Sequence, residues 1–269
     1  MATNPAYERV KAARANQRPT GLDYIGGIFT DFFELHGDRR SGDDAAIVGG
    51  VAYLDEMPVT VLAIEKGHNT KSRLERNFGA PSPAGYRKAL RLMQQAEKFH
   101  RPVLCFVDTS GARCDIEAET QGQGQAIAEN LTAMIGLQVP VLSVLIGEGG
   151  SGGALALAVA DEVWMLENAI YSVISPEGCA NILWKDAARA PDAAEYLKLT
   201  AADALKLGVV ERVITEWDKD STTFFDRLGD DIARKIITLL DIPATELTER
   251  RYQRFRALGV PVDKGAESK

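Results

Sequence analysis

The sequence predicts an α/β fold with a mostly parallel sheet, and two observations indicate it. A strand-and-loop unit occurs twice, because the apolar runs at 101–108 and 139–146 both have a proline near the start and end in a glycine-containing loop. A helical pattern of apolar residues over 125–137 separates the two runs. Strands that alternate with helices pair in parallel, and ligands of such sheets bind at the carboxyl ends of the strands.

The elements before these two strands follow from local patterns. Residues 1–36 have apolar positions at roughly helical spacing and predict helix, whereas 37–44 is rich in Gly and Asp and predicts a loop. Two strands, 46–54 and 59–64, are expected next, followed by a helix over 85–100. The apolar stripe of that helix consists of Ala89, Leu92, Met93, Ala96 and Phe99.

The elements after the repeated unit complete the expected domain. A short helix should begin near Gly153, a third strand should follow at 162–166, and the charged tail has a helical pattern. We expect one domain overall with three parts: an N-terminal helical segment (1–40), a core (41–220) and a C-terminal helical tail (221–269).

Composition limits the class of protein. The chain has 269 residues, 45% of them hydrophobic, which is enough for one buried core. No apolar run approaches the roughly 20 residues of a membrane helix, and the N-terminus lacks the apolar region of a secretory signal, so we expect a cytoplasmic protein. Cys105, Cys114 and Cys179 form no CxxC pair, which argues against a metal site. The net charge of −7 argues against nucleic-acid binding.

Positive charge is concentrated in one stretch of this acidic chain. Between Lys66 and Arg101 there are nine Lys or Arg residues but only two Glu. Such a stretch favours an anionic partner, either a phosphate-bearing ligand or an acidic subunit, with a solvated helix face as the alternative. Lys66 and Arg87 are the candidates in this stretch for cofactor binding.

The glycine-rich segment at 147–153 is the most informative part of the sequence. It has five glycines in seven residues and follows directly after a predicted strand. Glycines at a strand-to-helix junction let backbone N–H groups approach a phosphate or a carbonyl oxygen closely. Gly149, Gly150 and Ser151 are therefore candidate ligand-binding residues, and a tight turn that packs helix on strand is the structural alternative.

Two familiar motifs match this segment but lack their usual context. Residues 149–153 match G-x-S-x-G, yet a serine hydrolase of that type needs a histidine after the serine, and His36, His68 and His100 all precede Ser151. Gly147, Gly149 and Gly152 also match the dinucleotide motif G-x-G-x-x-G, with Glu167 at the expected spacing. That motif needs a longer helix than the sequence leaves room for before the next strand.

A third interpretation agrees with the repeated unit. In enzymes of the crotonase type, backbone amides from two loops, one after each of two strands, point at a thioester carbonyl. The loops at 109–112 and 150–154 have this arrangement, which makes Gly111 and Ala112 candidates beside the glycine segment. Such chemistry needs no His, Ser or Cys constellation, and none is visible in the sequence.

Several long motifs resemble the alpha subunit of the bacterial acetyl-CoA carboxylase carboxyltransferase. They occur in the expected order at 35–39, 47–50, 78–93, 146–156 and 171–185. The resemblance extends from about Arg18 to Ile214, with weaker support at 251–254. It implies a crotonase-like (ClpP/crotonase) ββα superhelix and a core that acts as a carboxyltransferase.

The resemblance also implies an activity, a set of partners and a site. The family transfers the carboxyl group from carboxybiotin, held on the biotin carboxyl carrier protein, to acetyl-CoA, which gives malonyl-CoA for fatty acid synthesis. Its partners are a zinc-ribbon beta subunit and biotin carboxylase, usually in a heterotetramer of two alpha and two beta subunits, with no membrane and no metal in the alpha chain. The N–H groups of Gly152 and Gly153 would then bind the biotin carbonyl oxygen, with Gly111 and Ala112 as the second loop.

One loop departs from the family pattern. Where the family has Tyr, Gly and a Glu-Arg pair, this chain has Arg113, Asp115 and Thr120-Gln121. The chain could therefore be a working subunit with an adjusted loop, a carboxyltransferase for a different acyl-CoA, or a less active second copy. A non-enzymatic assembly subunit is the remaining alternative.

Overall fold

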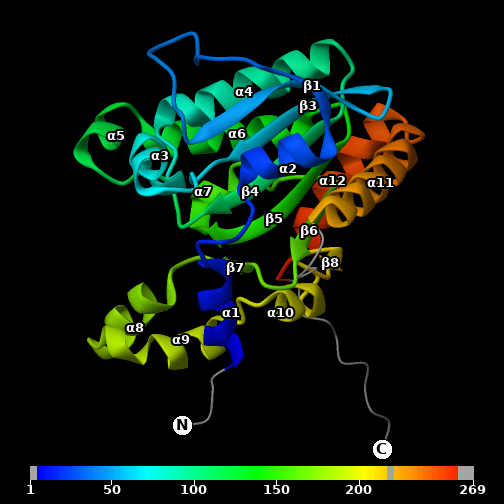
Figure 1. Cartoon of the computed structure of the whole chain (residues 1–269). Coiled ribbons are helices and arrows are strands. Elements are labelled where there is room, and N and C mark those ends of the chain that lie inside the picture. Colours follow the sequence, from blue (N-terminus) through cyan, green and yellow to red (C-terminus); the bar gives the residue numbers. More distant parts are fainter. Residues whose placement is uncertain (1–4, 217–220, 260–269) are drawn as a thin grey trace, which may run out of the picture.

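A computed structural model describes residues 5–216 and 221–259. Its centre is one eight-stranded sheet in which the strand order is β1-β2-β3-β4-β5-β6-β8, with β7 paired to β5. The first two strand pairs are antiparallel and the remaining pairs are parallel (Figure 1). The strands are β1 Thr30–Glu34, β2 Ile47–Leu54, β3 Met57–Ile64, β4 Val103–Thr109, β5 Val141–Gly150, β6 Glu162–Leu166, β7 Ile170–Ser172 and β8 Arg212–Ile214.

Helices cover both faces of the sheet. Leu62 and Ala63 are neighbours on β3 and therefore point to opposite faces. The Leu62 side faces α4, which packs against α6, and the Ala63 side faces α2, which packs against α11. The helices of this body are α2 Gly21–Ile28, α3 Thr70–Glu75, α4 Pro83–Lys98, α5 Ile116–Thr120, α6 Gln123–Gly136, α7 Ser151–Leu155, α10 Ala201–Lys206, α11 Ser221–Leu240 and α12 Ala244–Ala257.

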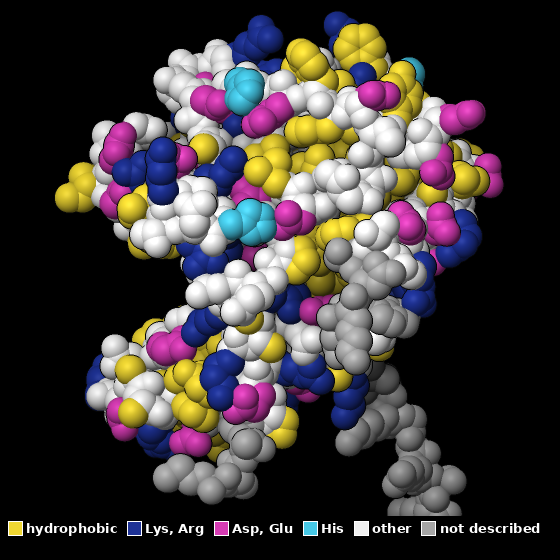
Figure 2. Space-filling view, viewed as in Figure 1, with side chains coloured by type: hydrophobic (Ala, Val, Ile, Leu, Met, Phe, Trp, Pro, Cys, Tyr) yellow, Lys and Arg dark blue, Asp and Glu magenta, His cyan; other side chains and the backbone are white. Residues whose placement is uncertain are grey.

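A smaller lobe lies beyond the carboxyl end of β5. It consists of α8 (Pro176–Trp184) and α9 (Ala190–Leu197), packed against α1 (Pro5–Ala13), and we call it the α8–α9 lobe. It has its own small core, formed by Ala6, Val10, Ala13, Ile170, Ala194 and Leu199. Figure 2 shows that the surface is deeply indented between this lobe and the sheet body.

Most predicted elements are confirmed. The predicted strands correspond to β2, β3, β4, β5 and β6, and the predicted helices correspond to α4, α6 and α7. The charged tail is helical over its described part, in α11 and α12. The buried stripe of α4 is confirmed for four of its five predicted residues. Phe99 is the exception, because it follows the last turn of the helix and is 56% exposed.

Two predictions about secondary structure were wrong. Residues 30–34 form β1 instead of helix, because Thr30 and Phe33 pair with Tyr53 and Val51 of β2, and this pairing overrides the local helical pattern. The segment predicted as a glycine loop continues β5 as far as Gly150, because Gly149 pairs with Thr109 and with β7.

Two short strands were not predicted. Neither β7 nor β8 was expected, and each has only three residues, too few for a periodic pattern.

The predicted division of the chain into three parts has no direct test. Residues 1–4, 217–220 and 260–269 lie outside the described residues, so the division at 1–40, 41–220 and 221–269 stays a prediction. Within the described residues, no helix has both the length and the apolar character needed to span a bilayer.

Candidate functional site

The two predicted glycine loops meet at the carboxyl ends of β4 and β5. A Cβ atom on Gly150 would lie 2.2 Å from the carbonyl oxygen of Ser110, and one on Gly153 would lie 2.5 Å from the backbone nitrogen of Ala112. Such distances leave no room for any side chain at either glycine. The structure therefore brings Gly111 and Ala112 into backbone contact with the segment that contains Gly150 and Gly153.

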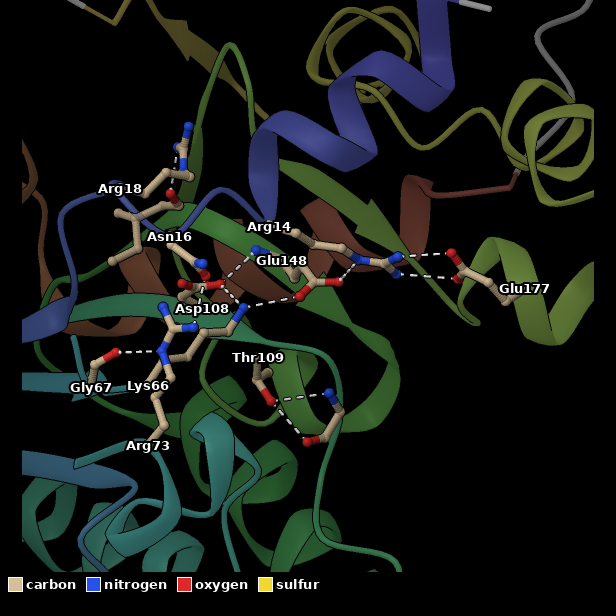
Figure 3. Close-up of polar contacts among 12 residues, drawn as sticks. Arg14, Asn16, Arg18, Lys66, Gly67, Arg73, Asp108, Thr109, Glu148 and Glu177 are labelled. Carbon is tan, nitrogen blue, oxygen red and sulfur yellow. Dashed lines mark hydrogen bonds and ion pairs between the residues drawn. The ribbon is translucent and has the colours of Figure 1, made fainter. Parts of the chain in front are cut away.

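The loop after β4 is shaped by the last residue of the strand. The hydroxyl of Thr109 accepts a hydrogen bond from the N–H of Gly111 at 3.0 Å and donates one to the carbonyl oxygen of Gly111 at 2.8 Å (Figure 3). Gly111 has a φ of +147°, which other residues rarely adopt. The loop is thus fixed by local hydrogen bonds in a conformation that needs glycine.

The segment after β5 turns sharply into α7. Ser151 has a φ of +53° at the start of this helix. Gly152 and Gly153 follow within its first turn, where backbone N–H groups have no partner inside the helix. A Cβ atom on Gly152 would meet only the Cγ2 of Ile127, at 3.8 Å, so the space beside Gly152 is open. The buried Tyr86 hydroxyl donates to the carbonyl oxygen of Gly153 at 3.1 Å and fixes that peptide group.

Three charged residues meet beneath the two loops, one from the end of each of three neighbouring strands. The ammonium of Lys66 lies 2.6 Å from Asp108 Oδ1 and 3.0 Å from Glu148 Oε1. Burial alone would lower the pKa of Lys66, but the two carboxylates outweigh it and raise that pKa. Burial would likewise raise the pKa of Glu148, but Lys66 and Arg14 hold it below its usual value. Lys66 and Glu148 are therefore both charged near neutral pH.

Arg14 extends this cluster toward the α8–α9 lobe. Its Nε donates to Glu148 at 2.7 Å, and its Nη1 donates to Glu177 on α8 at 2.8 Å (Figure 3). A cavity of about 220 Å³ lies on one side, lined by Lys66, Arg73 and Asp108 among others. A smaller hollow of about 30 Å³ borders 149–151. Arg14, Ser110 and Glu148 line both spaces and therefore lie where the two adjoin.

Comparison with known proteins identifies the family. The family model described as acetyl co-enzyme A carboxylase carboxyltransferase-like matches residues 3–259. The chain belongs to this family. It is 60% identical over 255 residues to the acetyl-coenzyme A carboxylase carboxyl transferase subunit alpha of Ruminiclostridium cellulolyticum, which covers 95% of this chain and 98% of that protein.

A further relative and a solved structure define the extent of the likeness. The chain is 50% identical over 258 residues to the carboxyl transferase subunits beta/alpha of Clostridium tetani, covering 94% of this chain and 45% of that protein. Among solved structures, transcarboxylase 12S has a TM-score of 0.69 at 20% identity, over 88% of this chain and 45% of that one. That identity shows the fold alone, and the predicted crotonase-like α/β fold is confirmed.

The serine hydrolase and dinucleotide interpretations are not compatible with the contacts in this carboxyltransferase-family chain. Two of the three histidines have acidic partners, since His36 pairs with Asp43 at 3.0 Å and His68 pairs with Asp23 at 3.1 Å. A Cβ atom on Gly147 would lie 2.3 Å from Asp108 Oδ1. That carboxylate occupies the place where a pyrophosphate would approach the backbone and would repel it.

The basic stretch is largely engaged in contacts within the chain. Lys66 is buried in the cluster described above, and Lys88 pairs with Asp43 at 2.5 Å. Arg87 pairs with Asp38 at 2.9 Å and donates to the carbonyl oxygen of Gln121 at 3.0 Å, so it joins two loops away from both hollows. The acidic partners of Arg87 and Lys88 come from 38–43, a loop that precedes the stretch. A role for Lys66 or Arg87 in cofactor binding stays a prediction.

The ion pair of Arg87 leads to a pH-dependent prediction. Burial alone would raise the pKa of Asp38, but three backbone N–H groups of its own loop and the Arg87 guanidinium hold it far below its usual value. A carboxylate with a lowered pKa stabilises the fold above its unfolded pKa of about 3.9 and loses that effect as the pH falls through the folded value. We expect Asp38→Asn to lower the free energy of unfolding by about 2 kcal/mol at pH 7.

Urea unfolding of wild type and Asp38→Asn between pH 3 and pH 7 would test this. The difference in unfolding free energy should be full at pH 7 and shrink below about pH 4. A difference that stays constant over the whole range would contradict the assignment of Asp38 as a charged anchor.

Some site residues were not found from the sequence. Arg14 carries no local signal, because its partners Glu148 and Glu177 lie 134 and 163 residues away in the chain. Asp108 could have been found, because it ends the first repeated strand as Glu148 follows the second. Among the described residues, no group of three or more His, Cys, Asp or Glu side chains could hold a metal ion.

Proposed function

We propose that this chain is the alpha subunit of an acetyl-CoA carboxylase carboxyltransferase. Together with a beta subunit, it transfers the carboxyl group from carboxybiotin on the biotin carboxyl carrier protein to acetyl-CoA, which gives malonyl-CoA for fatty acid synthesis. The observation that carries this proposal is the contact of two glycine loops, where Gly153 lies against the backbone nitrogen of Ala112. Membership of the carboxyltransferase family supports it.

The glycine segment fits a planar carbonyl-bearing group such as the ureido ring of biotin. Beside Gly152 the space is open, since its Cβ position has only one atom within 4 Å. At Gly153 the backbone is closed in by Ala112 and Tyr86. A carbonyl oxygen can therefore approach the N–H groups of Gly152 and Gly153 through the open space beside Gly152. The contacts of Gly153 with Ala112 and Tyr86 hold the backbone in place. Carboxybiotin supplies the activated carboxyl group.

The residues of this chain then act by positioning and by electrostatic stabilisation. The N–H groups of Gly152 and Gly153 hold a carbonyl oxygen on which negative charge develops. Gly111 and Ala112 form the facing loop, and Gly149, Gly150 and Ser151 shape the approach to it. Because the donors are backbone groups fixed before the reaction, they require no reorganisation and no side-chain base.

The proposed partners follow from the same assignment. A beta subunit supplies the acetyl-CoA side of the site and a zinc ribbon, and biotin carboxylase loads the carrier protein. The beta/alpha protein of Clostridium tetani, which joins both names in one chain, supports a close association of the two subunits. We propose a cytoplasmic heterotetramer of two alpha and two beta subunits.

The altered loop favours a working subunit over a degenerate copy. Arg113 pairs with Asp115 at 2.5 Å and with Glu117 at 2.8 Å, and Asp115 also accepts a hydrogen bond from the N–H of Ala118 at 2.9 Å. Arg113 therefore pairs with two acidic residues of the loop, and Asp115 caps α5 (Ile116–Thr120). A carboxyltransferase for a different acyl-CoA is the alternative that the assay below separates.

The proposal is tested by malonyl-CoA-dependent carboxylation of a soluble biotin derivative. The chain should be co-purified with the beta subunit of the same organism, with each subunit alone as control. We expect turnover only in the complex. Turnover on methylmalonyl-CoA without turnover on malonyl-CoA would assign a different acyl-CoA, and a stable complex silent on both would favour a regulatory or degenerate copy.

A further inference from the structure

Glu148 is the one residue with a side chain between Gly147 and Gly150. Any side-chain contact that holds this part of β5 must therefore pass through Glu148. Its backbone N–H donates to Asp108 Oδ1 at 2.7 Å, and its carboxylate binds Lys66 and Arg14 with different oxygens. The side chain is only 10% exposed, so these contacts are shielded from water.

The two cations on Glu148 come from different parts of the molecule. Lys66 follows β3 and belongs to the sheet body. Arg14 follows α1, which carries the α8–α9 lobe, and its guanidinium also binds Glu177 through two hydrogen bonds of 2.8 and 3.3 Å. Arg14 thus joins the glycine segment to the lobe, as the dashed lines in Figure 3 trace.

Backbone packing and the contacts of Glu148 hold the glycine segment. No side chain at Gly149 or Gly150 could hold the segment, because a Cβ atom there would collide with the side chain of Tyr171 or with the backbone of Ser110. Beyond Gly150 the chain turns at Ser151, which has a positive φ, and continues to the amides of Gly152 and Gly153. The direction of this turn is therefore set by the packed backbone and by Glu148. A shift of about 1 Å in such donors can reduce a reaction rate about 100-fold.

We propose that Arg14 is a positioning residue for the carboxyl transfer. Through Glu148 it fixes the glycine segment, and through Glu177 it ties that segment to the α8–α9 lobe. This inference rests on the proposed function for its effect on turnover, but its effect on the backbone of 147–153 does not depend on that function. A simple structural ion pair would instead affect stability without a selective effect on the segment.

The test compares Arg14→Gln and Arg14→Lys with wild type, in the complex with the beta subunit. Arg250→Gln is the matched control, since Arg250 is 61% exposed and pairs with Glu246 on α12. We expect Arg14→Gln to lower kcat about 10- to 100-fold, with KM for malonyl-CoA and the melting temperature little changed. Arg14→Lys keeps the charge beside Glu148 and should recover part of kcat.

Amide hydrogen exchange supplies a readout that needs no turnover. In Arg14→Gln, exchange should become faster at the amides of 147–153, whereas those of α12 should be unaffected. Unchanged exchange at 147–153 would overturn the inference even in an inactive complex. An inactive wild type together with faster exchange in Arg14→Gln would contradict the proposed function and leave the positioning role standing.

The lobe side of the connection is tested with Glu177→Gln. If Arg14 acts through Glu177, the double variant Arg14→Gln/Glu177→Gln should have the kcat of Arg14→Gln alone, because both changes break one connection. Effects on kcat that multiply in the double variant would show that Glu177 acts separately, and the link to the lobe would then be wrong. Wild-type kcat in Arg14→Gln would overturn the whole inference.

Discussion

Gly153→Val is expected to abolish turnover of the complex with the beta subunit. A Cβ atom at this position would lie 2.5 Å from the backbone nitrogen of Ala112, 2.8 Å from the carbonyl carbon of Gly111 and 2.9 Å from the Tyr86 hydroxyl. Two of these three neighbours are backbone atoms, which cannot move aside without displacing the facing loop. Loss of one oxyanion donor alone raises the barrier by about 2.7–4 kcal/mol, or roughly 100- to 1,000-fold in kcat.

The measurement is kcat for malonyl-CoA-dependent carboxylation of the biotin derivative. Gly124→Val is the matched control, because it makes the same chemical change on α6 at a position where a Cβ atom has no neighbour within 4 Å. Complex formation with the beta subunit should be checked for both variants. A folded, assembled Gly153→Val complex that retains near wild-type turnover would rule out the proposed role of the glycine segment.

Arg251→Met is expected to cause the largest loss of stability. Arg251 is 1% exposed, and its guanidinium donates to three backbone carbonyl oxygens, of Met134, Leu137 and Val139, at 2.7 to 3.0 Å. It also binds Asp161 at 2.7 Å. These contacts attach α12 to the end of α6 and to the start of β5. Removing the cation would leave the Asp161 carboxylate buried without its ion-pair partner, although the N–H of Val141 still donates to it, and breaking such a pair costs about 3–5 kcal/mol.

The free energy of unfolding from chemical denaturation tests this prediction. Arg250→Met, on the exposed side of the same helix, should change it by less than about 1 kcal/mol. Burial raises the pKa of Asp161 even beside Arg251, so Asp161→Asn should recover part of the loss when it is combined with Arg251→Met. Equal unfolding free energies of wild type and Arg251→Met would contradict the assigned role of this ion pair.

Much of the fold was predictable because its signals are local. The apolar runs of β4 and β5 are fully buried, and glycines mark the ends of both strands. Parallel pairing of these strands then follows from the helix between them, and it brings Gly111 and Gly153 together. The meeting of the two glycine loops could therefore be expected from the repeated unit, as could the crotonase-like fold from the motifs.

Local patterns failed where the contacts of a residue lie far along the chain. Phe33 has the spacing of a helical residue, yet pairing with Val51 places it in an edge strand, where it is 66% exposed. Lys66 belongs to a basic stretch, yet Asp108 and Glu148 neutralise it. Neither outcome has a signal within one helical turn or one strand, which is the range over which periodicity is informative.

The sequence by itself determined the family, the alternating order of strands and helices, and the glycines that leave the backbone amides accessible. Only the tertiary structure decided which charges meet beneath those glycines. Arg14 reaches Glu148 over 134 residues and Glu177 over 163 residues of chain. Ion pairs of such separation depend on how strands, loops and the α8–α9 lobe pack in space. The spacing of these residues along the chain therefore does not predict the ion pairs.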